Sequence, residues 1–444
     1  MLVNTRKLLA FFFLLLGWNS LQAQEVWTLK QCIDSALAHN NTLHIHRNLI
    51  RISEQKEKEA KANLIPKVEL RADYKYFIEL PTQLMPMNAL NPQIPEGQFR
   101  DVRFGVPHNI NAHVQLSLSI YNPQLYGAVA NTNIAQDLAK LNYQKNEENV
   151  LYDITTLYYN AQILQHQLLF LQSNLHNAQQ LLKNMELLRE QALATGTDVN
   201  KVKLQAEQLS TQKDIIHHKY LSLLYALKLN MGIPLEREIS LVPEIEKQSS
   251  EENKSENSVD LKIMQTQNSL LESELNTLKK SQYLPSLHAI ASYGTTGFGY
   301  DKKPDDFLKF YPIGFAGLQL TYPIFNATIT QRKINQKKLE ISNNKWQMEG
   351  IADKTKMEIE NAKRQRQIAL QTIANTENQI SLAQSIYDQT LLQQKQGKAT
   401  LSDILSADNA LRDAQQLYLT ALIDFLKAEL ELKKLSGNIS ELKN

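Results

Sequence analysis

Cysteine, glycine and proline are all scarce in this chain of 444 residues. The single cysteine, Cys32, can form neither an internal disulfide nor a CxxC metal site. The chain has only 14 glycines and 13 prolines, which is few for an ordinary α/β enzyme with many tight loops. The scarcity of these residues favours long, helix-rich elements.

An excess of charge of one sign is also absent, because 48 basic residues oppose 46 acidic ones and the net charge is +2. This excludes the strong basic bias of a dedicated nucleic-acid-binding protein. The mean hydropathy of −0.38 excludes a membrane protein built from several spanning helices. The apolar run at residues 8–16, LLAFFFLLL, is far shorter than the ~20 residues that a spanning helix needs.

That apolar run belongs to a predicted secretory signal peptide, residues 1–23. Arg6 and Lys7 supply its positive start, and cleavage is expected near Ala23. A lipoprotein signal would place a cysteine directly after the cleavage site, whereas Cys32 lies nine residues past Ala23. We therefore expect an exported chain without a lipid anchor, either soluble or inserted in an outer membrane without spanning helices.

The remaining chain repeats itself, which predicts two halves of one design. Four pairs of segments match in the same order, at offsets of 219, 204, 201 and 205 residues: 64–66 with 283–285, 115–122 with 319–326, 196–206 with 397–407, and 231–233 with 436–439. Each half is predicted to run helix, strand, loop, strand, long helix, glycine turn, helix. Residues 246–258, EKQSSEENKSENS, contain no apolar residue and read as a solvated linker.

The duplication predicts seven segments after the signal peptide. They are a helix at 24–65, two strands at 66–122 with a long loop at 80–109, a helical hairpin at 123–231 with its tip near Gly196, a polar linker at 232–258, a helix at 259–284, two strands at 285–325 with a loop at 294–312, and a second hairpin with the C-terminal segment at 326–444, its tip near Gly397.

Four segments alternate polar and apolar residues with the period of two that is typical of a strand. We expect strands at residues 67–79, 110–121, 286–293 and 313–322. The loop at 80–109 shows no strand or helix pattern. In the other loop, Gly294, Gly297 and Gly299 are interpreted as turn residues, because they do not lie between a strand and a helix as a phosphate-binding loop would.

The predicted strands match the ~9–11 residues that cross a bilayer at a tilt. Both long loops join the strands of a pair, and long loops on one side are typical of an outer-membrane barrel. The alternative is two amphipathic hairpins that cover a soluble core. Membrane barrels need about eight strands, so a membrane location requires several chains to share one barrel, eight strands for a dimer or twelve for a trimer.

The helices are predicted to be far longer than those of a globular domain. Residues 124–195 could form one helix of roughly 108 Å, at ~1.5 Å per residue, and residues 327–396 look alike. Apolar positions such as Ile404, Ala407 and Leu411 recur with the 3–4 spacing of a coiled coil, which could also describe a simple fibrous rod.

Glycine turns argue against the rod, because they fold each long helix back as a hairpin. Gly196 and Gly397 are predicted at left-handed helix C-caps, and Thr400 with Asp403 resembles a capping box. Prolines mark the junctions between helices and strands. Pro66 and Pro285 lie where a helix becomes a strand, and Pro123 and Pro323 lie where a strand becomes a helix.

No catalytic constellation is recognisable, since HExxH, GxSxG and GxxxxGK[ST] motifs are all missing. His217 and His218 are adjacent on a helix and face different directions, which makes them a poor metal pair. We therefore expect no enzyme activity, no cofactor and no metal.

The chain, with these repeats, resembles the TolC family of outer-membrane efflux proteins over essentially its mature length. The resemblance rests on WTLKQCIDSAL at 27–37 with Asn40 and Asn41, on the duplicated strands and helices, and on DILSA at 403–407 after Gly397. It implies a mainly α fold with a membrane β-barrel portion, in which four strands and two long coiled-coil hairpins per subunit form a trimeric α/β barrel. The implied location is the outer membrane, with a long periplasmic extension.

The resemblance also implies a function and partners. The homotrimer would be the exit duct of a tripartite efflux or type I secretion machine. Its partners would be a periplasmic adaptor (membrane fusion) protein and an inner-membrane pump such as an RND or ABC transporter, with outer-membrane lipid around the barrel and no nucleic acid. A periplasmic adaptor or a structural coiled-coil envelope protein is the alternative, but an adaptor would have one hairpin and an anchor.

A periplasmic gate is implied at the second hairpin tip. In the family, two acidic residues spaced by three line the closed entrance; Asp403 matches the first, and Ser406 stands where the second acid is found. The arginine and tyrosine that latch the entrance in some members correspond to Ala399 and Gln394 here. A ring of carboxylates would select cations. The alternative is that Asp403 only caps its helix.

Overall fold

The computed structural model describes residues 25–89, 92–245, 258–300 and 308–443. The predicted signal peptide and most of the EKQSSEENKSENS segment lie outside these residues. The chain divides into two compact units: one combines Met1–Leu49, Ala139–Met264 and Gln347–Asn444, and the other combines Ile50–Leu138 with Gln265–Trp346. No helix in the described ranges is long and apolar enough to cross a membrane.

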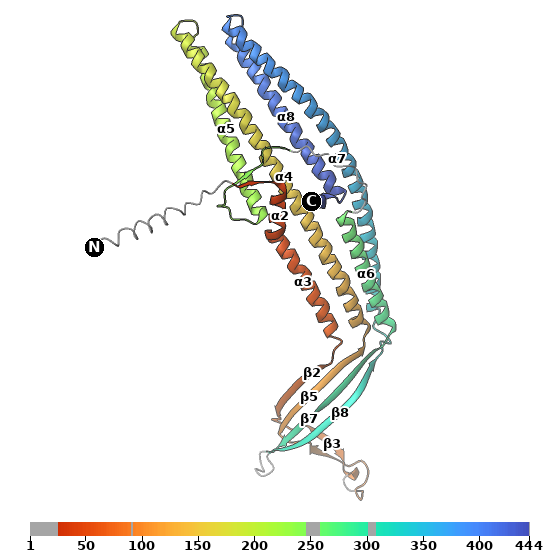
Figure 1. Cartoon of the computed structure of the whole chain (residues 1–444). Coiled ribbons are helices and arrows are strands. Elements are labelled where there is room, and N and C mark those ends of the chain that lie inside the picture. The colour runs from red at the N-terminus through yellow and green to blue at the C-terminus, as the bar shows by residue number, and fades with distance from the viewer. Residues whose placement is uncertain (1–24, 90–91, 246–257, 301–307, 444) are drawn as a thin grey trace, which may run out of the picture. The chain divides into compact units, whose positions relative to one another are not determined.

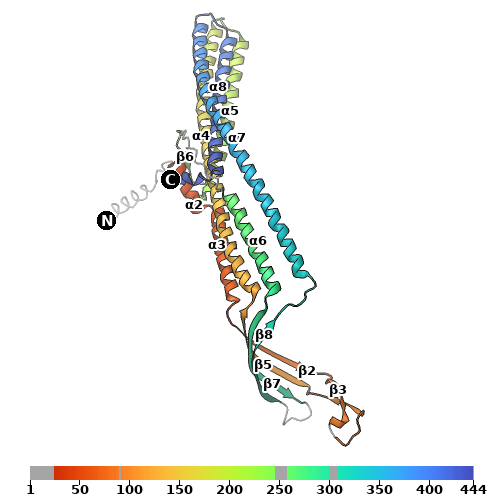
Figure 2. The same ribbon diagram turned by 90° about the vertical axis from the view of Figure 1, so that its right-hand side faces the viewer.

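The second unit contains a four-stranded antiparallel sheet (Figure 2). Its strands are β2 (Lys67–Tyr76), β5 (His108–Tyr121), β7 (Ser286–Gly299) and β8 (Lys309–Thr321), in the order β2-β5-β7-β8. The two predicted strand pairs therefore join through β5 and β7. Within the sheet, β2 and β8 are the edge strands.

The observed strands differ from the predicted ones mainly at the loop ends. β2 ends at Tyr76, because Phe77 leaves the sheet alternation and its amide donates to Pro107 O instead. β7 extends to Gly299 and β8 begins at Lys309, so the predicted loop at 294–312 was too long. Gly294, Gly297 and Gly299 are strand residues, and their interpretation as turn residues was wrong.

The segment 80–109 is not the structureless loop that the sequence suggested. It contains the antiparallel hairpin of β3 (Thr82–Pro86) and β4 (Phe99–Arg103), with the short 3-10 helix η1 (Met87–Ala89) between them. Pro86 occupies the last position of an edge strand, where a missing amide donor is tolerated. The prolines interrupt the alternation of polar and apolar residues, so these strands cannot be recognised from that alternation.

The helices connected to the sheet are α3 (Asn41–Ala62), α4 (Pro123–Glu190), α6 (Val259–Tyr283) and α7 (Ile329–Lys395). Within the second unit, α4 and α6 approach so closely at Gly127 that a Cβ there would lie 2.2 Å from Thr277 Cγ2. Lys337 on α7 pairs with Glu274 on α6 at 2.7 Å. A side chain at position 127 would therefore separate α4 from α6.

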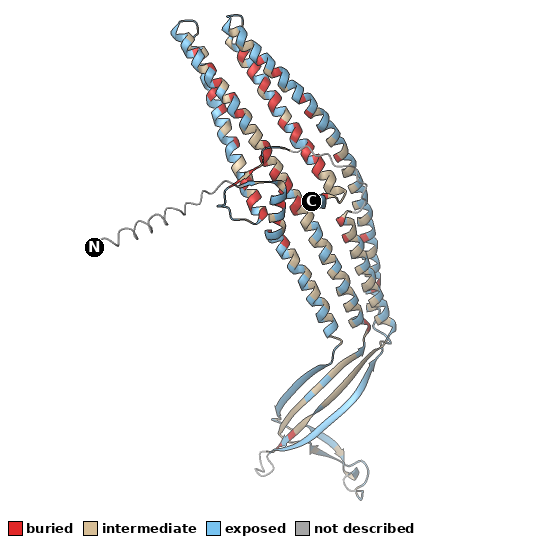
Figure 3. Ribbon diagram, viewed as in Figure 1, coloured by how far each residue is buried: buried red, intermediate tan, exposed pale blue. Residues whose placement is uncertain are grey.

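Two helical hairpins dominate the first unit (Figure 1). α4 folds back as α5 (Gly196–Met231), and α7 folds back as α8 (Leu401–Leu435). The predicted coiled-coil stripe of α8 is buried at Ile404, Ala407, Leu411, Ala414, Ala421, Phe425 and Ala428. Figure 3 shows that buried residues concentrate along these helices and are scarce in the strands.

In the first unit, a two-stranded sheet lies beside short helices from the beginning and the end of the chain. β1 (Glu25–Trp27) pairs in parallel with β6 (Ile239–Leu241), next to α2 (Leu29–His39) and the 3-10 helix η3 (Ile439–Lys443). The predicted polar linker at 232–258 thus contains a strand, whose Ile239 and Leu241 are buried. The linker prediction was wrong here because the strand depends on a long-range pairing that no local pattern signals.

The predicted helix at 24–65 is also divided, because α2 and α3 are separated at Asn40. Its side-chain oxygen accepts from the amides of Thr42 and Leu43 at 2.9 and 3.2 Å, which caps α3. Its side-chain nitrogen donates to Asn230 O at 2.7 Å, which ties the break to the end of α5. Asn40 therefore redirects the chain while remaining buried.

Candidate functional site

One face of the four-stranded sheet is apolar from edge to edge. Directly paired residues of antiparallel strands share a face, so the strand registers define rows that cross the sheet. The rows of this face are Leu118–Ala289–Leu318, Val68–Leu116–Ala291–Ala316, Leu70–Val114–Tyr293–Gly314, Ala72–Ala112–Thr295–Pro312, Tyr74–Ile110–Gly297–Phe310 and Tyr76–His108–Gly299, and Leu287–Leu320 precedes them. Apart from the tyrosine hydroxyls, the polar side chains in these rows are those of Thr295 and, in the row nearest the loops, His108.

The height of this apolar face fits the hydrocarbon layer of a membrane. Leu320 and Phe310 are ten residues apart on β8, which is about 33 Å along a strand at ~3.3 Å per residue. At the ~45° tilt of a transmembrane strand, this corresponds to roughly 23 Å, close to the ~25 Å apolar band of outer-membrane barrels. Tyr74, Phe310 and Tyr76 lie in its last two rows, where such barrels have an aromatic girdle.

The opposite face of the sheet is mainly polar on β2, β5 and β7. Its rows are Ser119–His288–Gln319, Lys67–Ser117–Ile290–Gly317, Glu69–Gln115–Ser292–Phe315, Arg71–His113–Gly294–Ile313, Asp73–Asn111–Thr296–Tyr311 and Lys75–Asn109–Phe298–Lys309. A sheet with one apolar and one polar face suits a barrel between lipid and water. β8 departs from this division, since it has apolar residues on both faces.

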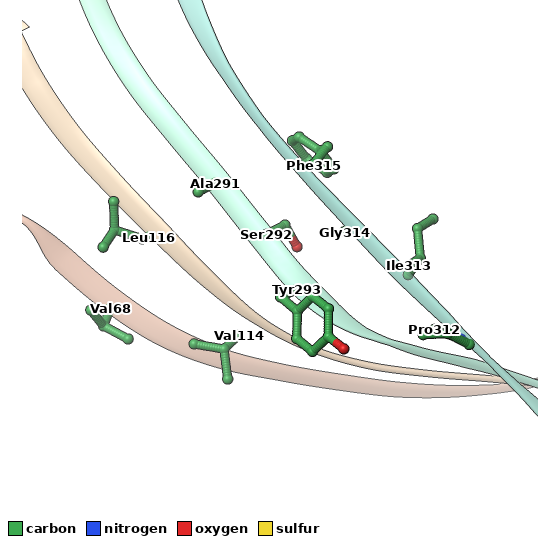
Figure 4. A pocket seen from close by; sticks show the side chains of 10 residues that line it. All are labelled: Val68, Val114, Leu116, Ala291, Ser292, Tyr293, Pro312, Ile313, Gly314 and Phe315. Carbon is green, nitrogen blue, oxygen red and sulfur yellow. The ribbon is translucent and has the colours of Figure 1, made fainter.

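Two glycines of the sheet accommodate aromatic rings from the neighbouring strand. A Cβ at Gly314 would lie 2.8 Å from the ring of Tyr293, its partner on β7, and a Cβ at Gly297 would lie 2.6 Å from the ring of Phe310. The aromatic rings thus cover backbone that glycine leaves bare. Figure 4 shows Tyr293 and Gly314 among the ten residues of a broad, open hollow to which all four strands contribute. The hollow is a property of the sheet surface and not an enclosed ligand cavity.

All four junction prolines lie where a helix and a strand meet. Pro66 precedes β2, Pro285 precedes β7, and Pro323 lies between β8 and α7. Pro123 is the first residue of α4, where its missing amide costs nothing. The side chain of Asn122 accepts from Gln124 N at 2.9 Å and caps the same helix. The strand-to-helix transition of the first repeat is thus specified by the Asn-Pro pair.

The second hairpin tip has the geometry that the sequence predicts. Gly397 has φ 72°, in the left-handed region, and the amides of Gly397 and Lys398 donate to Gln394 O and Gln393 O. Thr400 caps α8 in a complete capping box with Asp403: Asp403 Oδ2 accepts from Thr400 N at 2.8 Å and from Thr400 Oγ1 at 2.7 Å.

The first hairpin tip has the same geometry, but not at the predicted residue. Gly196 is the first residue of α5, and it is Ala192, with φ 57°, that occupies the left-handed position. Thr195 caps α5 in a box with Asp198, whose Oδ2 accepts from Thr195 N at 3.1 Å. The prediction of a left-handed cap at Gly196 was therefore wrong.

The correct register between the two tips is an offset of 205 residues. Ala192, Thr195 and Asp198 correspond to Gly397, Thr400 and Asp403 in backbone geometry. The offset of 201 aligned two glycines with different roles. An acidic residue of the first tip, Asp198, was missed for this reason, although the Thr-x-x-Asp pattern it shares with the second tip is visible in the sequence.

Asp403 is exposed and Asp198 is partly exposed, and both carboxylates are held in their charged form. Hydrogen bonds from the Thr400 hydroxyl and amide lower the pKa of Asp403, and those from Thr195 lower the pKa of Asp198 in the same way. Ser406 is exposed one helical turn after Asp403, whereas Ala399 and Gln394 are partly buried. The capping role of Asp403 does not exclude a gate role, because the carboxylate lies at the surface.

Behind the tips, the two hairpins pack through a shared core. Leu181, Met185 and Val202 of the first hairpin contact Tyr387 and Ile404 of the second in one buried cluster. Polar contacts follow next to this core, where Gln205 Nε2 donates to Asp408 Oδ2 and Asn174 Nδ2 donates to Gln415 Oε1 at 2.8 Å.

Asp408 is the buried acid of this interface. Arg412 Nε lies 3.1 Å from its Oδ2. Burial raises the pKa of Asp408 above its ordinary value, and Arg412 and Gln205 oppose the rise. The hairpins are thus joined by apolar and polar contacts, and the polar contacts include a group that can titrate.

Comparisons with known proteins identify this architecture. Residues 255–438 match the family described as outer membrane efflux protein. The match covers most of the second repeat. No match was found among curated protein sequences. The location in the outer membrane and the TolC-like fold, both predicted from the sequence, are confirmed.

Three solved structures illustrate the similarity of fold. The Vibrio cholerae outer membrane protein VceC is 16% identical, with a TM-score of 0.72 over 92% of this chain and 96% of that one. The Campylobacter jejuni channel CmeC is 15% identical, with a TM-score of 0.74 over 92% and 85%. The Neisseria gonorrhoeae channel MtrE, solved in its open state, is 14% identical, with a TM-score of 0.71 over 93% and 89%.

The matched family is described as outer membrane efflux protein, and CmeC and MtrE are described as outer membrane channels. The expected role of an exit duct for efflux in the outer membrane agrees with the family match. Neither alternative, the periplasmic adaptor or the structural coiled-coil protein, is supported by a comparison.

Proposed function

We propose that three copies of this outer membrane efflux protein form one twelve-stranded barrel that is continuous with a helical tunnel. The observation that carries this proposal is the division of a four-stranded sheet into an apolar and a polar face. Four strands cannot close a barrel, and unpaired edges in lipid would cost several kcal/mol per backbone group. The edge strands β2 and β8 run in opposite directions, so β8 of one copy can pair in antiparallel fashion with β2 of the next.

The long helices supply the periplasmic extension. α4 has 68 residues and α7 has 67, which gives each a length of about 100 Å at ~1.5 Å per residue. Exposed apolar residues on α7, such as Leu339, Trp346 and Leu382, suit packing against a neighbouring copy. Substrates would cross this tunnel passively, and an inner-membrane pump of the RND or ABC class, connected by a periplasmic adaptor at the hairpin tips, would supply the energy.

The tips form the gate in this proposal. Three copies would bring three Asp403 and three Asp198 carboxylates to the periplasmic entrance, with Ser406 next to the first set. A ring of like charges attracts cations and opposes closure. The MtrE channel has been solved in an open state, and movement of the hairpins at Gly196 and Gly397 would produce an equivalent state here.

The oligomeric state tests the barrel. Protein solubilised in a mild detergent should have the mass of three chains by light scattering with the detergent contribution subtracted. A mass of one or two chains, in a preparation that is folded by circular dichroism, would overturn the twelve-stranded barrel.

Cation selectivity tests the gate. Asp403→Asn keeps a side-chain acceptor for the Thr400 amide and removes the charge, so it separates the gate role from the cap role. We expect reduced cation block and reduced cation selectivity in planar bilayers, with wild-type stability. Asp424→Ala, which removes an exposed carboxylate elsewhere on α8, is the matched control. Unchanged selectivity in Asp403→Asn would reduce this residue to a cap.

A further inference from the structure

The polar face of the sheet has an apolar stripe that the membrane does not explain. On β8, Tyr311, Ile313 and Phe315 share this face with Thr296, Gly294 and Ser292 of β7. Each of the three β8 side chains is more than half exposed. Lipid contact requires apolar residues on the opposite face only, so these three side chains need another purpose.

The other edge of the same face has a stripe of charge. On β2, Lys67, Arg71 and Lys75 alternate with Glu69 and Asp73. Arg71 pairs with Glu69 at 2.9 Å and Lys75 pairs with Asp73 at 3.5 Å. Lys67 instead donates to the neutral Asn63 Oδ1 at 2.9 Å.

The described strands therefore give this face a positive balance. Lys309 on β8 adds a fourth cation, whereas β5 and β7 contribute no Asp, Glu, Lys or Arg to these rows. Four cations against two carboxylates leave an excess of two positive charges per subunit. A water-filled barrel lined in this way attracts anions.

Closure of the barrel brings the two stripes together. β8 and β2 are the open edges of each sheet, so they become neighbours at every subunit boundary. The rows of their polar faces both point to the interior, because the other faces contact lipid. Each of the three boundaries then has an aromatic stripe from one copy beside a cationic stripe from the next.

We propose that these boundaries form a binding strip for exported organic anions that contain an aromatic ring. This inference rests on the proposed trimer and names the substrate class of its barrel. A ring can stack on Phe315 or Tyr311. Arg71, whose Nε and Nη2 donate to Glu69 Oε2, and Lys75 supply positive charge for a carboxylate or sulfonate. Three equivalent exposed strips give weak and repeated binding, which permits release to the outside.

Current block by two matched anions tests the proposal. Naphthalene-1,5-disulfonate and pentane-1,5-disulfonate have the same charge, and only the first has an aromatic ring. Each is added to the barrel side of purified trimers in planar bilayers. We expect the naphthalene compound to reduce the current at a concentration about tenfold lower, since ring contacts add to the charge attraction. Raising the salt to ~1 M should weaken block by both compounds.

Variants separate the contribution of ring contacts to the block from the contribution of positive charge. Phe315→Thr, at an exposed strand position where threonine is well tolerated, should reduce the preference for the naphthalene compound by about two- to tenfold. Tyr311→Thr serves the same purpose if the first variant does not assemble. Arg71→Gln should weaken block by both compounds. Lys58→Gln, which removes an exposed charge on α3, is the control and should change neither.

The outcomes separate this inference from the trimer. If trimers conduct but the two disulfonates block equally, or if both threonine variants keep the wild-type preference, the binding strip is wrong and the barrel stands. If the protein is monomeric and does not conduct, the proposed barrel itself is wrong.

Discussion

Replacement of Val114 by arginine tests which face of the sheet contacts lipid. Val114 lies between Leu70 and Tyr293 in a row near the middle of the apolar band. Arginine at the midplane of a membrane barrel costs about 2–4 kcal/mol. This lowers the folding equilibrium roughly 30- to 700-fold per subunit, and the cost applies to all three subunits.

The neighbouring residue is the matched control. Gln115→Arg introduces the same side chain one position along β5, on the polar face and opposite Glu69. We expect Val114→Arg to lose folded trimer in the outer-membrane fraction and to unfold at lower urea concentration in lipid vesicles. Gln115→Arg should behave as wild type. Equal loss in both variants, or loss in Gln115→Arg alone, would refute the assignment of the faces.

Two further predictions concern the hairpins. Ala192→Gly should stabilise the protein by about 0.5–1 kcal/mol in urea unfolding, because glycine relieves a left-handed alanine, and Gly397→Ala should destabilise it by about 1 kcal/mol; a shift of the same sign in both would contradict the shared geometry of the tips. Asp408→Asn should remove a pH dependence. Burial raises the pKa of Asp408 in the folded chain, so its contribution to stability is complete below the unfolded pKa of ~3.9 and is lost as pH rises through the folded pKa. Between about pH 4 and pH 7, the melting temperature should therefore change less with pH in Asp408→Asn than in wild type. An equal change in both proteins would show that Asp408 is not the group responsible.

Local periodicity predicts most of the sheet because apolar and polar side chains alternate between its two faces. Val68 and Leu70 alternate with Glu69 and Arg71, and this alternation requires no knowledge of the neighbouring strand. Periodicity fails where the cause is a cross-strand contact. Gly294 and Gly297 look like turn residues in sequence, yet Gly297 is a strand residue that accepts the ring of Phe310 from β8. A single strand does not encode which ring will cover its glycine.

The short strands of the first unit were missed for a related reason. β6 has three residues and pairs with β1, which lies more than two hundred residues earlier in the chain. Its surroundings are polar in composition, so the segment was interpreted as a linker. The hairpin of β3 and β4 is masked by Pro86 and by the prolines around it. Short elements stabilised by distant partners leave almost no local signal.

At the hairpin tips, the presence of a glycine does not by itself identify the residue with the left-handed conformation. A left-handed C-cap favours glycine, but alanine can occupy it at a cost of about 1–2 kcal/mol, and Ala192 does so. The capping boxes are the better guide, since Thr195 with Asp198 and Thr400 with Asp403 each require two reciprocal hydrogen bonds at fixed spacing. The caps align the repeats at an offset of 205 residues, which the match between residues 231–233 and 436–439 shares. The same alignment pairs Gly232, φ 69°, with Gly437, φ 75°, so the duplication keeps one backbone design from the tip to the end of each returning helix. The proposed gate then has two acidic positions per subunit, one from each tip, Asp198 and Asp403.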